Sequence, residues 1–170
     1  MKLSDNLIQY TGKILFEPNN ITKKHENQAS WKRVAMVMLS GDICEYYAWF
    51  LKKRFNLEFI KPIRGAHITF INDSVNDIGE NLGKWEELKN KWNGKKINIV
   101  LNTNYYSSGK HWWQIVDFDH RDELQSIRSE IGLGKPNFGL HMTVGIVNEK
   151  NLEFSQYLNI LEKKGYIKFK

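Results

Sequence analysis

Two segments of the chain share one form: residues 66–71 read AHITFI, and residues 140–146 read LHMTVGI. Because side chains alternate between the two faces of a strand, a strand over each segment places its histidine and threonine on one face, about 7 Å apart. Ile68 and Phe70 in the first segment, and Met142 and Val144 in the second, fall on the opposite face. The pattern therefore predicts two strands that are polar on one face and packed on the other.

Further strands and helices interleave around these two segments. Apolar runs bounded by turn residues predict strands over 34–39, 96–101, 111–118 and 166–169. Apolar residues at helical spacing predict helices over 43–55 and 119–131, with Asp42 and Asp119 as their N-caps, and over 81–92 and 154–163. Residues 17–30 are typical of a long loop or a short polar helix. We therefore expect one domain, 1–170, of the α/β or α+β class, in which roughly the first 30 residues add a strand and a loop.

Length, charge and cysteine content indicate the broad class of the protein. The 170 residues are enough for one domain with its own core, and 41% of them are hydrophobic. The net charge of +6 favours anionic partners such as nucleotides, although a solvated lysine-rich surface would give the same value. The lone cysteine, Cys44, has no partner for a disulfide within the chain, and we expect it to pack in the core. Since no apolar run could span a bilayer and no signal peptide is present, we expect a soluble, intracellular protein without membrane contact.

A pair of histidines facing one gap suits the cleavage of a phosphodiester next to a free hydroxyl. That reaction needs a base for the attacking oxygen and an acid for the leaving oxygen, and an imidazole with its ordinary pKa of about 6.5 can serve as either. Threonine hydroxyls can donate hydrogen bonds to the nonbridging phosphate oxygens, where charge grows in the transition state. His67, Thr69, His141 and Thr143 are therefore the candidate catalytic residues, and we expect no metal or other cofactor.

Four further residues are candidates for contacting the substrate. Arg64 and Lys135 come just before the two motif strands, where a cation can meet a phosphate. Tyr10 and Lys13 combine an aromatic ring with a nearby positive charge, which suits a base and its phosphate. Residues 105–113 combine two tyrosines and two tryptophans with a lysine in the same way, although core packing is the favoured interpretation for such rings. The three other histidines have no close metal-ligand spacing to one another.

The two His-x-Thr segments resemble the motifs for which the 2H phosphoesterase superfamily is named, and the resemblance extends from Val34 to Val147. It implies an α+β fold of two antiparallel-sheet lobes related by a pseudo-dyad, with helices outside and a central cleft that receives one motif from each lobe. It also implies that His67 and His141 form the acid–base pair and that Thr69 and Thr143 bind the phosphate.

Within this superfamily the chain is similar to the phage anti-CBASS nucleases, through residues 45–50, 112–113 and 127–133 together with the second motif. The similarity implies a viral immune-evasion enzyme of the host cytoplasm that degrades cyclic di- and trinucleotide signals and needs no obligate protein partner. Aromatic and acidic residues hold the bases in that branch, and Tyr10 is the candidate here. Two alternatives stay open: a 2H enzyme of RNA processing that acts on 2′,3′-cyclic phosphate ends or 2′–5′ linkages of short RNA, and a nucleotide- or RNA-binding module without turnover.

Overall fold

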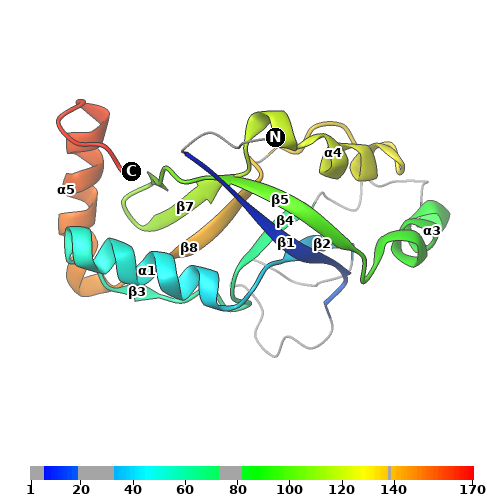
Figure 1. The fold of residues 1–170 in the computed structure, drawn as a ribbon, viewed down its shortest axis with the longest axis horizontal. Helices are drawn as coiled ribbons and strands as arrows, with labels where there is room; N and C mark the ends of the chain where they lie inside the picture. The colour runs from blue at the N-terminus through cyan, green and yellow to red at the C-terminus, as the bar shows by residue number, and fades with distance from the viewer. Residues whose placement is uncertain (1–5, 19–32, 73–81, 138) are drawn as a thin grey trace.

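The computed structural model describes residues 6–18, 33–72, 82–137 and 139–170 as a mixed α+β fold (Figure 1). The strands are β1 (Leu7–Phe16), β2 (Ala35–Met38), β3 (Phe59–Ile60), β4 (His67–Ile71), β5 (Lys96–Asn102), β6 (Tyr106–Ser107), β7 (His111–Ile115) and β8 (His141–Val147). The helices described are α1 (Asp42–Phe55), α3 (Leu82–Trp92), α4 (Asp122–Ser129) and α5 (Leu152–Lys163), with short 3₁₀ turns η2 (Phe118–His120) and η3 (Glu149–Asn151).

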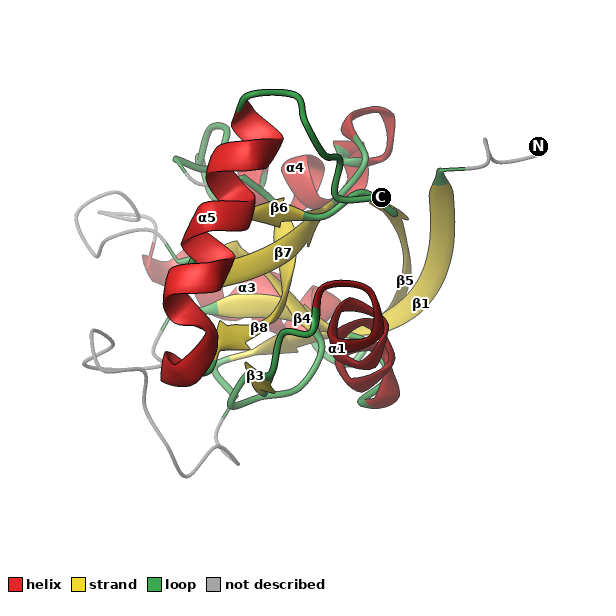
Figure 2. Cartoon of the chain, turned by 90° about the vertical axis from the view of Figure 1, so that its left-hand side faces the viewer, coloured by secondary structure: helices red, strands yellow, loops and turns green. Residues whose placement is uncertain are grey.

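All eight strands belong to one antiparallel sheet that curls strongly. Its order is β5-β1-β2-β4-β8-β7-β6, and β3 pairs with β8 off this path. The curl brings the β5 edge back to the end of β7, where Leu101 pairs with Val116 and the Asp117 N–H donates to the Val100 carbonyl at 2.9 Å. Figure 2 shows this curvature, with β1 and β5 on one side of the molecule and β7 and β8 on the other.

One face of the sheet supplies the hydrophobic core. Ile14, Val37, Ile68 and Met142 lie opposite one another on four consecutive strands, and each is fully buried. Removing this apolar area from water is the main stabilising contribution to the fold. The helices lie toward the two ends of the curled sheet, with α1 and α5 at one end and α3 and α4 at the other (Figure 1).

The helices pack on this same face of the sheet. The Trp85 ring of α3 contacts Phe16 of β1 at 5.2 Å between centroids. The indole N–H of Trp112, a fully buried residue of β7, donates to the Ser155 hydroxyl of α5 at 2.9 Å. The Cys44 thiol of α1 donates to the Thr143 carbonyl of β8 at 3.3 Å, and burial raises the thiol pKa to about 12. The expectation that Cys44 packs in the core is therefore confirmed.

The strand expected over residues 166–169 is wrong, because this segment is not paired in the sheet. The apolar residues that predicted it do reach the core in part, since Phe169 is buried against Trp112. The carbonyls of Lys168 and Lys170, however, accept hydrogen bonds from the Arg54 side chain. The end of the chain is therefore held by an arginine and by packing.

Both predicted N-caps also differ from the structure. Gly41 is the N-cap of α1, and Asp42 is the first residue inside the helix. Asp117 caps the turn η2 by accepting a hydrogen bond from the Asp119 N–H, and α4 begins only at Asp122. The chain after β7 therefore turns through η2 before the longer helix starts, so the strand expected over 111–118 ends at Ile115.

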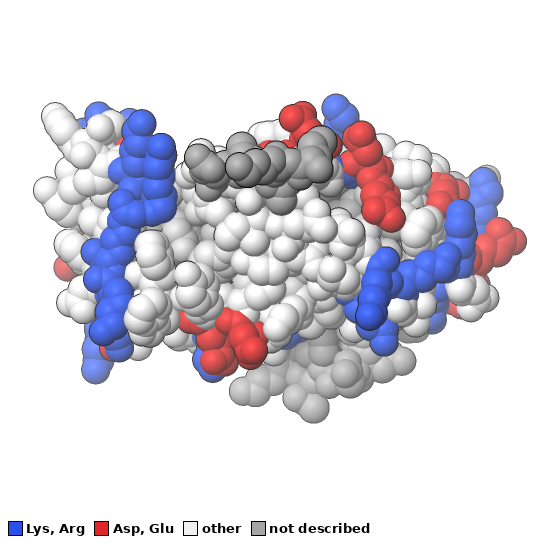
Figure 3. Space-filling view, viewed as in Figure 1, with Lys and Arg blue, Asp and Glu red and all other residues white. Residues whose placement is uncertain are grey.

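The expected loop or helix over 17–30 lies largely outside the described residues. β1, by contrast, is described in full and lies between β5 and β2, so the first strand is an internal member of the sheet. No helix in the described part of the chain is both long and apolar enough to cross a membrane. Lys and Arg side chains gather over the region of α1 and the C terminus and over that of α3, with mostly uncharged surface between them (Figure 3).

Candidate active site

The two motif strands are neighbours, and their register is centred on the motifs. Ile68 of β4 lies directly opposite Met142 of β8 in an antiparallel pair. Continuing this register by one residue in each direction places His67 opposite Thr143 and Thr69 opposite His141. Ile68 and Met142 are fully buried, so the four polar side chains share the other face, where each is partly exposed. The structure thus brings together all four candidate catalytic residues.

This arrangement has a local two-fold symmetry whose axis passes between Ile68 and Met142. The strands on either side obey it: in β2 and β7 the paired positions are Met36 opposite Thr69, Met38 opposite His67, Trp113 opposite Thr143 and Ile115 opposite His141. Each flanking strand carries a register shift at the matching place, between Ala35 and Met36 in β2 and between Trp112 and Trp113 in β7.

The hydrogen bonds at the start of the motif strands obey the same symmetry. The Leu39 N–H donates to the Ala66 carbonyl at 2.9 Å, and the Val116 N–H donates to the Leu140 carbonyl at 2.9 Å. Ala66 and Leu140 each precede a motif histidine. Two segments far apart in the sequence therefore present their histidines from backbones of matching construction.

Each histidine ring is fixed by a backbone carbonyl two residues earlier. Nδ1 of His67 lies 2.9 Å from the Gly65 oxygen, and Nδ1 of His141 lies 2.5 Å from the Gly139 oxygen. Because a carbonyl oxygen can only accept, Nδ1 carries a proton in both rings. In the neutral form of each ring the basic nitrogen is then Nε2, and this atom gains or loses the exchangeable proton.

The register also fixes the spacing between the candidate catalytic groups. His67 and His141 are diagonal neighbours on adjacent strands, a relation that puts their Cβ atoms about 7–8 Å apart. Two imidazoles at this spacing can reach atoms on opposite sides of one phosphate group. Each threonine lies beside the histidine of the other strand, where its hydroxyl can donate to a nonbridging oxygen.

A hollow of about 490 Å³ lies next to the second motif. Its walls come from β7 and β8 and the segments that adjoin them: Ser108, His111, Trp113, Ile115, Gly139, His141 and Thr143. The Trp113 ring lies 6.2 Å from the His141 ring, at an interplanar angle of 61°. On its β6 side Trp113 stacks on Tyr106, at 6.4 Å and 20°. The hollow therefore offers an aromatic wall beside one of the two histidines.

Arg64 lies near the first motif. Its Nη1 is 3.5 Å from the sulfur of Met36, the residue opposite Thr69. Burial lowers the pKa of the Arg64 guanidinium to about 10, which keeps the side chain positively charged at neutral pH. The structure therefore places the predicted cation beside the strand pair that carries His67 and Thr69.

Arg128 of α4 connects the two motif segments, although its side chain is only 1% exposed. Its Nη1 donates to the Phe70 carbonyl, next to Thr69, and its Nε donates to the Gly134 carbonyl, both at 2.8 Å. Gly134 belongs to the loop that leads into β8 and that also contains Gly139. The guanidinium thus ties the first motif strand to the loop that supplies the carbonyl for His141.

The other predicted contact residues are not gathered at the motifs. Tyr10 lies on the core side of β1, where its hydroxyl is 2.7 Å from that of Tyr47, and burial together with this hydrogen bond raises its pKa. Lys13 lies opposite Met38 and is thus two strands away from His67 on the same side of the sheet. Lys135 is exposed in the loop before β8.

Two parts of the site were not predicted from the sequence, namely Arg128 and the carbonyls of Gly65 and Gly139. Trp113 was among the rings considered for base stacking, but core packing was the favoured interpretation. The glycine carbonyls had a signal, since a glycine stands two positions before each motif histidine. Trp113 follows the buried Trp112, and their opposite faces could have been inferred from strand alternation. Nothing in the local sequence of Arg128 distinguishes it from a surface arginine.

Comparison with protein families, curated proteins and solved structures gives no match to this chain. Among the residues that the structure describes, no group of three or more His, Cys, Asp and Glu side chains is arranged to hold a metal ion.

Proposed function

We propose that this protein is a phosphodiesterase in which His67 and His141 act as the acid–base pair. The observation that carries the proposal is the matched orientation of the two rings. Both are held at Nδ1 by a glycine carbonyl, so that Nε2 exchanges the proton, and they are diagonal neighbours on paired strands. A buried structural role would not need two imidazoles prepared in the same way on one partly exposed face. The local two-fold symmetry supports a fold of the 2H phosphoesterase type.

The reaction follows from this geometry. The Nε2 of one neutral histidine accepts the proton of a ribose 2′-hydroxyl as that oxygen attacks the adjacent phosphorus. The bond from phosphorus to the 5′-oxygen breaks, and the Nε2–H of the other, protonated histidine donates its proton to the departing oxygen. The threonine hydroxyls stabilise the nonbridging oxygens as their charge grows. The products are a 2′,3′-cyclic phosphate and a free 5′-hydroxyl.

For the substrate we propose a cyclic oligonucleotide of the kind used as an antiviral signal, which would make the protein a viral immune-evasion enzyme. The hollow beside His141 supports this choice, because its described lining is aromatic and apolar in Trp113 and Ile115 and contains no lysine or arginine. An enzyme for long RNA would instead be expected to follow the backbone with a basic groove.

The first test is a cleavage assay in the presence of EDTA. The substrates are cyclic di- and trinucleotides, 2′,3′-cyclic mononucleotides, and short 2′–5′- and 3′–5′-linked RNAs. We expect rapid opening of a cyclic oligonucleotide by wild type, and a 10²- to 10⁴-fold loss of kcat in His67→Ala and His141→Ala, about the usual contribution of one acid or base. His120→Ala is the matched control, because this ring pairs with Asp117 away from the motifs.

The other outcomes separate the alternatives. Cleavage limited to RNA ends or to 2′–5′ linkages would indicate RNA processing. Binding of nucleotides without any turnover by wild type would indicate a binding module. Near-normal turnover by a folded His67→Ala or His141→Ala variant would exclude the two-histidine mechanism. If EDTA inhibits the enzyme and added metal restores activity, the reaction depends on a metal ion, contrary to the proposal.

A further inference from the structure

The local two-fold symmetry of the site is broken at the positions that flank the motifs. Trp113 lies opposite Thr143, and its symmetry mate, Met36, lies opposite Thr69. The next strands continue the difference, since Tyr106 lies opposite Trp113 whereas Leu15 lies opposite Met36. An aromatic pair on one side of the site therefore corresponds to two aliphatic side chains on the other.

The aromatic pair is placed to contact a ligand at His141. Trp113 is partly exposed, lines the hollow and lies 6.2 Å from the His141 ring. Tyr106, which is 39% exposed, stacks on it at 20° and so limits the orientations of the indole. A fixed, partly exposed indole beside a catalytic imidazole provides a flat surface of the kind on which nucleobases stack.

The symmetry-related position has a different character. Met36 is fully buried and its sulfur lies 3.5 Å from the Arg64 guanidinium, so this position offers no exposed side chain on which a base could stack. Among the described residues of β1 and β2 at the matching positions there is no ring. The two sides of a bound phosphodiester therefore meet different surfaces.

We propose that Trp113, supported by Tyr106, is a stacking subsite for one nucleobase, that of the nucleoside on the His141 side of the scissile phosphate. The nucleoside on the His67 side meets no ring from the described strands β1 and β2, and so we expect it to contribute less stacking. This proposal rests on the proposed function and adds to it that the site binds the two halves of its substrate unequally. A substrate with two identical bases is thus bound in one preferred direction.

The test uses a dinucleoside monophosphate and its two abasic forms, in which the base of either the 5′-side or the 3′-side nucleoside is removed. For wild type we expect one abasic form to lose roughly tenfold to a hundredfold in kcat/KM and the other to lose little, in line with the worth of one base–aromatic stack. Trp113→Ala should lower kcat/KM for the parent by the same factor and cleave the sensitive abasic form as wild type does. Trp113→Phe should keep most of the preference.

Trp49→Ala is the matched control, because this tryptophan is 55% exposed on α1, on the other side of the sheet. Equal losses for the two abasic forms, or a preference that persists in a folded Trp113→Ala variant, would overturn the proposal. If wild type cleaves neither these compounds nor a cyclic oligonucleotide, the proposed function fails; if it cleaves only the cyclic oligonucleotide, the proposed function stands. In both cases stacking is decided by calorimetric titration with adenosine 3′-monophosphate. Tighter binding to wild type than to Trp113→Ala supports the subsite, and equal affinities overturn it.

Discussion

The candidate catalytic histidines depend for their orientation on backbone atoms that lie outside the His-x-Thr motifs. His67 and His141 are oriented by the carbonyls of Gly65 and Gly139, so the relevant chemistry is that of the backbone two residues upstream. A substitution at either glycine would keep a carbonyl at that position, although a side chain at Gly65, where φ is 70°, would strain the backbone. The orientation of each ring instead depends on whatever holds these short segments, and Arg128 does so for the second one.

We expect Arg128→Met to lower the free energy of unfolding by about 2–4 kcal/mol, because the buried Phe70 carbonyl and the partly buried bond to the Gly134 carbonyl lose their charged donor. The loop from Gly134 to Gly139 should then hold His141 less firmly, so kcat should fall more than KM changes. Lysine cannot reproduce the two-pronged contact to Phe70 and Gly134, and Arg128→Lys should therefore recover little of either loss.

Urea denaturation and steady-state kinetics of the same preparations check the expectation for Arg128. Arg54→Met provides the control, since this arginine is exposed and its hydrogen bonds within the described part of the chain go to Lys168 and Lys170; a change within about 0.5 kcal/mol is expected there. Full recovery by Arg128→Lys would mean that charge alone matters at this position, contrary to the geometry.

At the scale of elements, apolar runs and alternation predicted most of the strands, and helical spacing predicted the helices. The strands over 34–39 and 96–101 and the helices over 43–55 and 154–163 are confirmed to within two residues, because each buries one face against the core. The sequence also indicated that both motifs lie on strands. It did not indicate that these strands are adjacent or which residues face each other, because pairing partners depend on contacts distant in the chain.

The false strand over 166–169 has the same physical origin as the correct ones. A buried position such as Phe169 needs an apolar residue, whether or not the backbone has a strand to pair with. The backbone N–H of Tyr105 donates to the Phe169 carbonyl, and the Arg54 side chain donates to the carbonyls of Lys168 and Lys170. Periodicity reports which side chains are buried, and the partners of the backbone have to be established separately.

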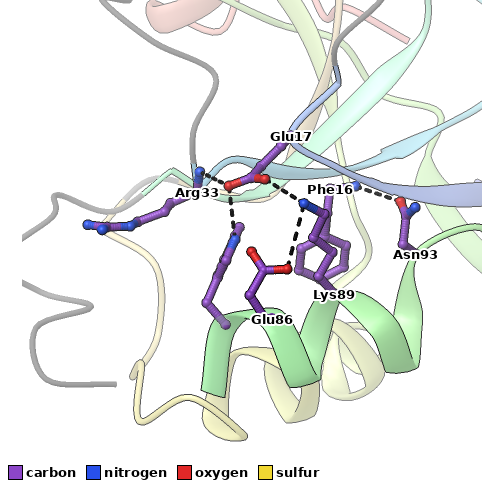
Figure 4. Close-up of polar contacts among 7 residues, drawn as sticks. Phe16, Glu17, Arg33, Glu86, Lys89 and Asn93 are labelled. Atoms are coloured by element: carbon purple, nitrogen blue, oxygen red, sulfur yellow. Dashed lines mark hydrogen bonds and ion pairs between the residues drawn. The ribbon is translucent and has the colours of Figure 1, made fainter. Parts of the chain in front are cut away.

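Glu17 joins the end of β1 to α3 and to the start of the segment that enters β2 (Figure 4). Its carboxylate accepts hydrogen bonds from the Lys89 ammonium at 2.7 Å, the Trp85 indole at 3.0 Å and the Arg33 N–H at 3.1 Å. Burial by itself would raise the pKa of the Glu17 carboxyl, but the three donors outweigh burial and hold the pKa below its ordinary value. The charged form is therefore the one that the fold stabilises.

A carboxyl whose pKa is lower in the folded state stabilises the fold above its unfolded-state pKa, about 4.3, and this contribution disappears as the pH falls through the folded-state value. We expect Glu17→Gln to lower the free energy of unfolding by about 1–2 kcal/mol at pH 7, and the difference from wild type to shrink toward zero as the pH falls below the folded-state pKa of Glu17. Urea denaturation across this range measures it. Glu86→Gln, on the exposed side of the same lysine, should change little. A difference that is constant with pH would contradict the assignment.

At the scale of the whole molecule, the curled sheet contains a close approach of its paired strands β1 and β2. β1 connects the β5 edge to β2, and β2 in turn pairs with the motif strand β4. At Gly12 the two strands approach so closely that an added Cβ would lie 2.3 Å from a methyl carbon of Val37 and 3.0 Å from the Met38 carbonyl. Only a residue without a side chain fits this contact.

We therefore expect Gly12→Ala to push β1 away from β2 and to lower the free energy of unfolding by about 2–3 kcal/mol, the usual cost of overpacking a tight core contact. Since β1 carries β5 with it, the pairing of β5 with the segment after β7 should also loosen, and the Asp117 N–H should exchange with solvent faster than in wild type. Urea denaturation measures the first effect and amide hydrogen exchange the second. Gly134→Ala serves as the control, because a Cβ there meets nothing within 4 Å. An unchanged urea midpoint in Gly12→Ala would mean that β1 and β2 lie farther apart at Gly12 than in this structure.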